Sequence, residues 1–229
     1  MNNTRGLSLT TIMNRTSLVS KAKRTLNKIL VLIMFCFGVS AGLAGSDKPN
    51  LLVNGDFELG AELPDGWRFI GKDGALPQKQ VDESVVYEQE NGPVGKRALL
   101  LKEGGAQVMI RQNLEGEPSP EYEYKLSGYV KTENFSGKYV RLAVIDKGFS
   151  KFYAFIDVKN DNQDWTPVET TFKMPETSKG VSVVFYTSGE FSGKAWVDGI
   201  KLEQERKLTD AELAVATGDE KKNSLPSQK

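Results

Sequence analysis

The sequence predicts an all-β protein, a β-sandwich of the jelly-roll type with about 10–11 antiparallel strands. Short runs of β-branched and aromatic residues lie between Asn50 and Gln204, and Gly, Pro, Asn or Asp interrupts them roughly every 8–12 positions. About eleven such runs fit into this stretch, which suits a two-sheet sandwich. The overall composition, 39% hydrophobic and 26% charged, is ordinary for a globular domain, so one domain is expected over residues 50–204.

Residues 1–44 precede this domain and have the layout of a secretory signal peptide. They contain six basic residues and no acidic one, and the apolar run Ile29–Val39 is followed by the small residues of Ser40–Ala44. The apolar run is too short to cross a membrane, which takes roughly 20 residues. We expect cleavage near Ala41 or Ala44 and a secreted, periplasmic or cell-envelope protein. The alternative is an uncleaved leader, which would be the chain's only link to a membrane.

The composition of the chain excludes several classes of function. It has no histidine and one cysteine, Cys36, which lies inside the apolar run, so histidine-based triads, zinc sites and disulfide scaffolds are excluded. Beyond the leader, 24 basic residues face 30 acidic ones. A body of net negative charge, without a cluster of Lys and Arg, has no electrostatic basis for binding nucleic acid. We therefore expect a neutral or apolar partner.

The strands are expected where β-branched and aromatic residues are densest. The clearest are Lys125–Lys131, Tyr139–Ile145, Phe152–Val158, Pro167–Met174, Val181–Ser188 and Ala195–Glu203. Weaker ones are Leu51–Glu58, Trp67–Ile70, Ser84–Gln89, Arg97–Lys102 and Gln107–Leu114. After Gln204 the chain becomes polar and charged, so residues 205–229 are expected to be a mostly disordered tail with a short helix over Asp210–Ala216.

Alternation along the strands assigns their side chains to faces, because residues i and i+2 of a strand share one side. Four strands, those beginning at Gln107, Tyr139, Phe152 and Val181, are expected to share one sheet with a shallow groove on its outer face. The side chains expected on that face, as candidate ligand-binding residues, are Arg111, Arg141, Tyr153 and Tyr186. Phe152 or Phe155 is expected in the core.

Four motifs in sequence order resemble bacterial carbohydrate-binding modules of the cellulose and xylan type, families four, nine and twenty-two. They are Asn50–Glu58 with Pro64–Trp67, Tyr124–Lys131, Asp164–Pro175 and Ala195–Leu202. The resemblance covers about 155 residues and implies a jelly roll of the galactose-binding-domain type that binds sugars. It also implies a structural calcium ion in many relatives.

Three carboxylates, Asp56, Glu58 and Asp198, are the candidate ligands for that calcium ion. The first and last strands of a jelly roll can lie side by side, and oxygen ligands suit Ca²⁺. The resemblance is incomplete here, because relatives tend to have two adjacent aspartates where this chain has Asp198 and Gly199. The alternative is that Glu58 and Asp198 face water or pair with Lys48 or Lys201.

The function expected from these features is a non-catalytic module that binds a neutral polysaccharide or oligosaccharide on a concave sheet face. The sandwich uses the whole domain, which leaves no long insertion to build a deep catalytic cleft. Sugars are held by aromatic rings on their apolar faces and by planar polar groups on their hydroxyls. The alternative function is an envelope or assembly protein that uses the same sandwich to bind another protein.

Overall fold

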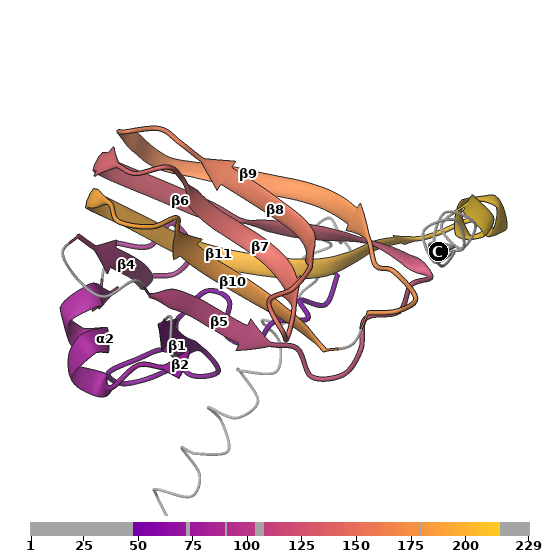
Figure 1. Ribbon diagram of the computed structural model, residues 1–229, viewed down its shortest axis with the longest axis horizontal. Coiled ribbons are helices and arrows are strands. Elements are labelled where there is room, and N and C mark those ends of the chain that lie inside the picture. Colours follow the sequence, from indigo (N-terminus) through magenta and orange to yellow (C-terminus); the bar gives the residue numbers. More distant parts are fainter. Residues whose placement is uncertain (1–47, 72–73, 90, 104–107, 179, 216–229) are drawn as a thin grey trace, which may run out of the picture. The chain divides into compact units, whose positions relative to one another are not determined.

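A computed structural model describes residues 48–71, 74–89, 91–103, 108–178 and 180–215. The expected leader, Gln107 and the last residues of the expected tail (216–229) lie outside these ranges. Two antiparallel sheets pack face to face, as the sequence predicts (Figure 1). The six-stranded sheet has the order β2-β1-β5-β10-β7-β8, and its strands are β1 Arg68–Gly71, β2 Gly74–Ala75, β5 Met109–Asn113, β7 Val140–Asp146, β8 Phe152–Val158 and β10 Val181–Thr187.

The second sheet has five strands in the order β3-β4-β11-β6-β9. Its strands are β3 Val85–Glu88, β4 Ala98–Lys102, β6 Tyr122–Ser136, β9 Gln163–Lys173 and β11 Ser192–Lys207. One helix that the sequence analysis did not predict, α2 Gln78–Ser84, precedes β3. Ten of the expected strands are therefore found at or near their expected positions.

The eleventh expected strand, Leu51–Glu58, does not form. The segment lies beside β11, since the Leu51 N–H donates to the Leu202 carbonyl and the Ile200 N–H to the Gly55 carbonyl, both at 2.8 Å. It then turns sharply, with left-handed backbone angles at Asn54 (φ 53°) and Phe57 (φ 56°). These turns direct the Phe57 side chain inward, so the alternation of a strand is lost.

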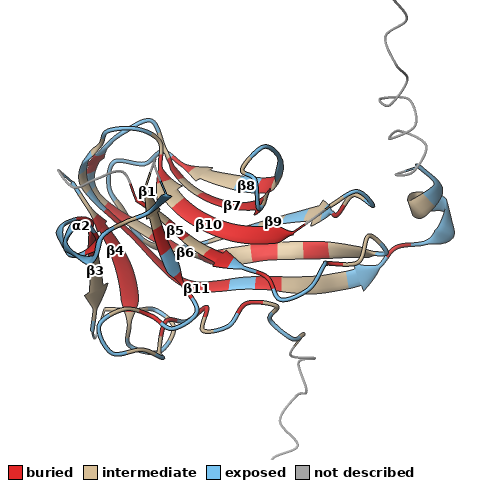
Figure 2. Ribbon diagram, turned by 60° about the horizontal axis from the view of Figure 1, so that its bottom comes forward, coloured by how far each residue is buried: buried red, intermediate tan, exposed pale blue. Residues whose placement is uncertain are grey.

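The core lies between the two sheets and accounts for the alternation seen in the sequence (Figure 2). Leu142 and Phe185, for example, are fully buried there, as expected from their places in the strands. Trp67 closes one end of the core. Its ring packs 5.2 Å from that of Phe57, and its Nε1–H donates to the Asn54 carbonyl at 2.9 Å. Trp67 is thus structural, as the sequence analysis favoured.

The ordered structure continues past Gln204, where the polar tail was expected to begin. β11 continues to Lys207 beside β6, and Leu208 is buried. Residues 210–215 are helical, in agreement with the short helix predicted there. Arg206 connects this helix to the sheet, because its guanidinium pairs with both Glu123 (2.9 Å) and Glu212 (2.7 Å). Of the segment 205–229, which was expected to be mostly disordered apart from this helix, residues 205–207 instead extend strand β11. Residues 216–229, outside the described ranges, leave the rest of that prediction open.

Candidate functional site

The outer face of the six-stranded sheet, here called the groove face, carries three rows of side chains that follow the strand register. In one row Ile70, Met109, Tyr186, Arg141 and Asp157 are direct partners across β1, β5, β10, β7 and β8. Directly paired residues of neighbouring antiparallel strands point to the same side of a sheet. Arg141 and Tyr186 therefore lie on one face of one sheet, as predicted.

The other two rows follow in order to one side of this one, because β10 contributes Tyr186, Val184 and Ser182 in turn. The first is Arg68, Arg111, Val184, Ala143 and Phe155, and the second is Asn113, Ser182, Ile145 and Phe152. Small apolar side chains form the floor, where Ala143, Ile145 and Val184 are covered by Met109, Phe149 and Tyr186. The sheet curves so that β1 and β8 rise on either side of β10 (Figure 2). This face therefore has an apolar centre with polar and aromatic margins.

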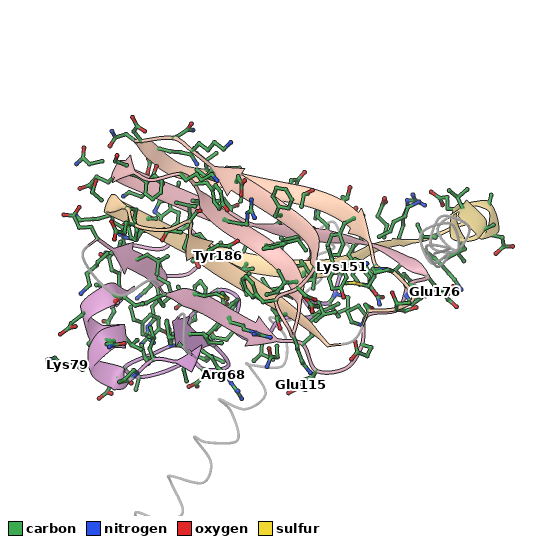
Figure 3. The ribbon with its side chains drawn as sticks, viewed as in Figure 1. Arg68, Lys79, Glu115, Lys151, Glu176 and Tyr186 are labelled. Carbon is green, nitrogen blue, oxygen red and sulfur yellow. The ribbon has the colours of Figure 1, made fainter. Side chains whose placement is uncertain are left out.

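A pocket of about 420 Å³ opens on the β1–β5 side of the groove face. Its walls include Arg111, Lys147, Phe149 and Tyr186, and glycines 71, 74 and 148 form part of its rim. Figure 3 shows Tyr186 over the middle of the sheet and Arg68 toward the β1 margin. The volume is within the range of small-molecule sites, and the half-buried Tyr186 ring offers an apolar surface for a ligand.

Arg141 is held in place by internal partners. Its Nε and Nη2 donate to the two carboxylate oxygens of Asp157 at 2.6 and 2.8 Å, and its Nη1 lies 3.5 Å from the Tyr186 hydroxyl. The bond to Asp157 raises the guanidinium pKa further above its ordinary value. The guanidinium carbon is also 4.3 Å from the ring centroids of Tyr139 and Phe155. Arg141 therefore organises the aromatic side chains as much as it offers donors to a ligand.

Arg111 is also partly engaged. Its Nη2 donates to the Lys147 carbonyl and the Ser182 hydroxyl, both at 2.9 Å, and its Nε to Asn113 at 3.0 Å. Burial lowers the guanidinium pKa from its ordinary value. None of these partners carries a negative charge on its side chain. Arg111 therefore has no direct ion-pair partner among the described residues at the pocket wall, although the nearby Asp146 carboxylate favours its charged form.

The placement predicted for Tyr153 is wrong. A register shift between Val144 and Ile145 pairs Ile145 with Phe152, so Phe152 takes the position on the groove face. Tyr153 packs against the main core instead. Phe152 and Phe155, one of which was expected in the core, are 36% and 52% exposed. With Phe149 they form an aromatic chain of edge-on contacts, with ring centroids 5.8 and 6.2 Å apart.

The candidate metal ligands lie near one another around the loop that precedes β4. Glu58 Oε1 accepts the N–H groups of Lys96 (2.6 Å) and Arg97 (2.7 Å), and these bonds lower the Glu58 pKa. Asp198 is fully buried, and its two oxygens accept the N–H groups of Val94 and Gly199 at 2.9 and 2.5 Å. Burial, with repulsion by Glu58 and Asp56, raises the Asp198 pKa to about 7.

These contacts do not yet make a calcium site. Within the described ranges, no three carboxylate, imidazole or thiol side chains are grouped so that they could hold one ion. Backbone N–H donors take up oxygens of Glu58 and Asp198 that a cation would need. The repulsion among the three carboxylates is what a cation would relieve. Calcium therefore stays a prediction, and its test is described in the Discussion.

The fold and the site together define a class of protein: a β-sandwich module with an aromatic, pocketed ligand face on one sheet. Residues 49–192 match the family model described as "Carbohydrate binding domain". The chain belongs to this carbohydrate-binding family. A search of curated proteins by sequence finds no match. Among the described residues, no helix has the length and apolar character needed to cross a membrane.

Solved structures with the same fold include sugar-binding and other proteins. The carbohydrate-binding module TmCBM61 in complex with β-1,4-galactotriose is 19% identical, with a TM-score of 0.51 over 69% of this chain and 99% of that chain. A Stig cyclase from Fischerella sp. TAU is 15% identical, with a TM-score of 0.53 over 70% of this chain and 98% of that chain. At such low identity these likenesses show the shared fold alone.

Proposed function

We propose that this chain is an exported, non-catalytic module that binds a polysaccharide or oligosaccharide on the groove face. The observation that carries the proposal is the pocket in which the Tyr186 and Phe149 rings lie beside the Arg111 guanidinium. Neutral pyranose rings have apolar faces that pack on aromatic rings, while their hydroxyls accept hydrogen bonds from guanidinium groups. The family match supports a carbohydrate ligand and does not favour the alternative of an assembly protein.

The proposed module binds its sugar without cleaving it. A Stig cyclase shares the fold, so architecture alone leaves enzymatic activity open. Among the described residues that line the pocket, the titratable side chains are Arg111, Lys147 and Tyr186, without a carboxylate. Hydrolysis of a glycosidic bond usually uses a pair of carboxylic acids placed on either side of it. The pocket is therefore better suited to binding than to glycoside hydrolysis.

Replacing Tyr186 by Ala should weaken sugar binding by about tenfold to a hundredfold, since the pocket loses its stacking ring and the Arg141 donor loses a partner. A glycan array would identify the ligand, and titration calorimetry with that ligand would measure the change. Trp165→Ala is the matched control, because Trp165 is a partly exposed aromatic residue on β9 of the other sheet. Equal loss in both variants, or none in Tyr186→Ala, would contradict the assignment of the site.

Export is a further expected result, based on the basic stretch, apolar run and small residues of positions 21–44. Mass spectrometry of protein purified from its native host should find a new amino terminus between Ala41 and Ser46. Recovery of the intact leader on a cytosolic protein would contradict it.

A further inference from the structure

The pocket end of the groove face has a positive charge that the chain as a whole does not have. Arg68 and Arg111 are direct partners on adjacent strands, so the two guanidinium groups share this face. Lys147 directly follows the last residue of β7 and lines the same pocket as Arg111. Arg68 and Lys147 are exposed, and Arg111 is half-buried. Three cations are thus gathered on one side of the apolar floor.

The described residues do not neutralise this charge by direct ion pairs. Nine ion pairs occur within the described ranges, and none of them includes Arg68, Arg111 or Lys147. Arg141, by contrast, is paired with Asp157 at the other side of the sheet. The repulsion between Arg68 and Arg111 and the burial of Arg111 both disfavour the charged guanidinium, while Asp146 favours it.

The carboxylates of neighbouring segments are turned toward backbone donors. Asp146 accepts the N–H groups of Ser150 and Lys151, both at 2.7 Å, and the Ser150 hydroxyl at 2.8 Å. Glu117 accepts the N–H of Gly180 at 2.7 Å. These bonds stabilise the β7–β8 turn and the start of β10. The charged side chains among the described residues that line the pocket are therefore the cations Arg111 and Lys147. A ligand that adds a negative charge there would compensate Arg111 and Lys147.

We propose that the pocket takes an acidic sugar, a residue that carries a uronate carboxylate. This inference rests on the proposed function and refines it. The net negative charge of the whole domain favours a neutral ligand, but the positive charge at the pocket favours an anionic one. The sugar ring would lie against Tyr186 and Phe149, and the carboxylate would face Arg111 and Lys147. Arg111 Nη1 makes no hydrogen bond to a described residue, so it is the guanidinium nitrogen that would donate to the carboxylate.

The test compares sugars that differ only in charge. Calorimetry would measure the affinity of the purified protein for tetragalacturonate and for its methyl ester, and for a xylo-oligosaccharide with and without a glucuronic acid substituent. In at least one pair we expect the acidic sugar to bind about tenfold more tightly at low salt, the usual scale of a charge-assisted hydrogen bond. The preference should shrink in 0.5 M salt, which screens exposed charges.

Variants connect this preference to the pocket. Lys147→Gln should reduce the affinity for the acid several-fold more than the affinity for its uncharged partner, and Arg111→Gln should do so if it folds. Lys201→Gln is the matched control, because Lys201 is an exposed cation on β11 of the other sheet. Equal affinity for the two members of both pairs, or equal losses for the acid and its uncharged partner in Lys147→Gln, would overturn the acidic ligand.

Failure of this inference is distinguishable from failure of the proposed function. A protein that binds only neutral sugars, and loses them on Tyr186→Ala, keeps the proposed function and overturns the acidic ligand. A protein that binds no sugar on a glycan array of acidic and neutral structures overturns both.

Discussion

Asp157→Ala should lower the free energy of unfolding by about 2–4 kcal/mol, because it leaves the guanidinium of Arg141 with an uncompensated charge. The Arg141 and Asp157 side chains are only 13% and 18% exposed, so water replaces the lost carboxylate poorly. The aromatic contacts of Arg141 with Tyr139 and Phe155 depend on this orientation, so the groove face should lose order as well. Chemical denaturation of the variant and the parent protein would measure the difference.

A double-mutant cycle separates the ion pair from the packing of the arginine side chain. Arg141→Met with Asp157→Ala should cost less than the sum of the two single changes, since the double variant buries no lone charge. Asp164→Ala is a control, because Asp164 is an exposed carboxylate on β9. A double variant whose loss equals that sum would show that the two side chains do not stabilise one another.

The stability of the domain should fall as pH rises from about 4 to 7, on account of Asp198. Burial, with repulsion by Glu58 and Asp56, raises the Asp198 pKa from 3.8 to about 7, although the N–H groups of Val94 and Gly199 act in the opposite direction. The folded protein therefore holds this proton more tightly than the unfolded chain does. The stabilisation is complete below the pKa that Asp198 has in the unfolded chain. It is lost as pH rises through the pKa that Asp198 has in the folded protein. The expected loss is on the order of 2–4 kcal/mol.

Denaturation in chelator at a series of pH values would measure this dependence. Asp198→Asn should remove most of the slope between pH 4 and 7, whatever its effect on absolute stability. Asp56→Asn removes one of the two charges that repel the Asp198 carboxylate, so it should lower the Asp198 pKa and end the loss of stability at a slightly lower pH. The shift should be small, because Asp56 is exposed and water screens its charge. Equal slopes in the parent protein and in Asp198→Asn across this range would show that Asp198 ionises with an ordinary pKa in the folded state.

The same experiment with calcium tests the predicted ion. A cation at Asp198 and Glu58 would favour the ionised carboxylates and so reduce the loss of stability near pH 7. The melting temperature should then rise with free calcium, and saturation at 100 times Kd would add about 2.7 kcal/mol. Identical melting curves in chelator and in millimolar calcium would rule out the ion.

The sequence alone determined the sandwich, ten of its strands and much of the groove face. Alternation with a period of two assigned Arg141 and Tyr186 to one face, and their strands proved to be hydrogen-bonded neighbours. The same rule failed for Tyr153, because the register shift before Ile145 moves Phe152 to the groove face. It failed again at Leu51–Glu58, where the left-handed turns at Asn54 and Phe57 replace a strand. Local pattern predicts a face only while the strand remains regular.

Only the tertiary structure decided how the charged side chains are used. Arg141 meets Asp157 because β7 and β8 are paired in a particular register, and Asp198 meets the Val94 N–H across 104 positions of the chain. Those contacts decide which cation is neutralised by an ion pair, as Arg141 is, and which one lines the pocket without such a pair, as Arg111 does. A side chain's charge is written in the sequence, but its partners and its exposure to water depend on segments that come together only on folding.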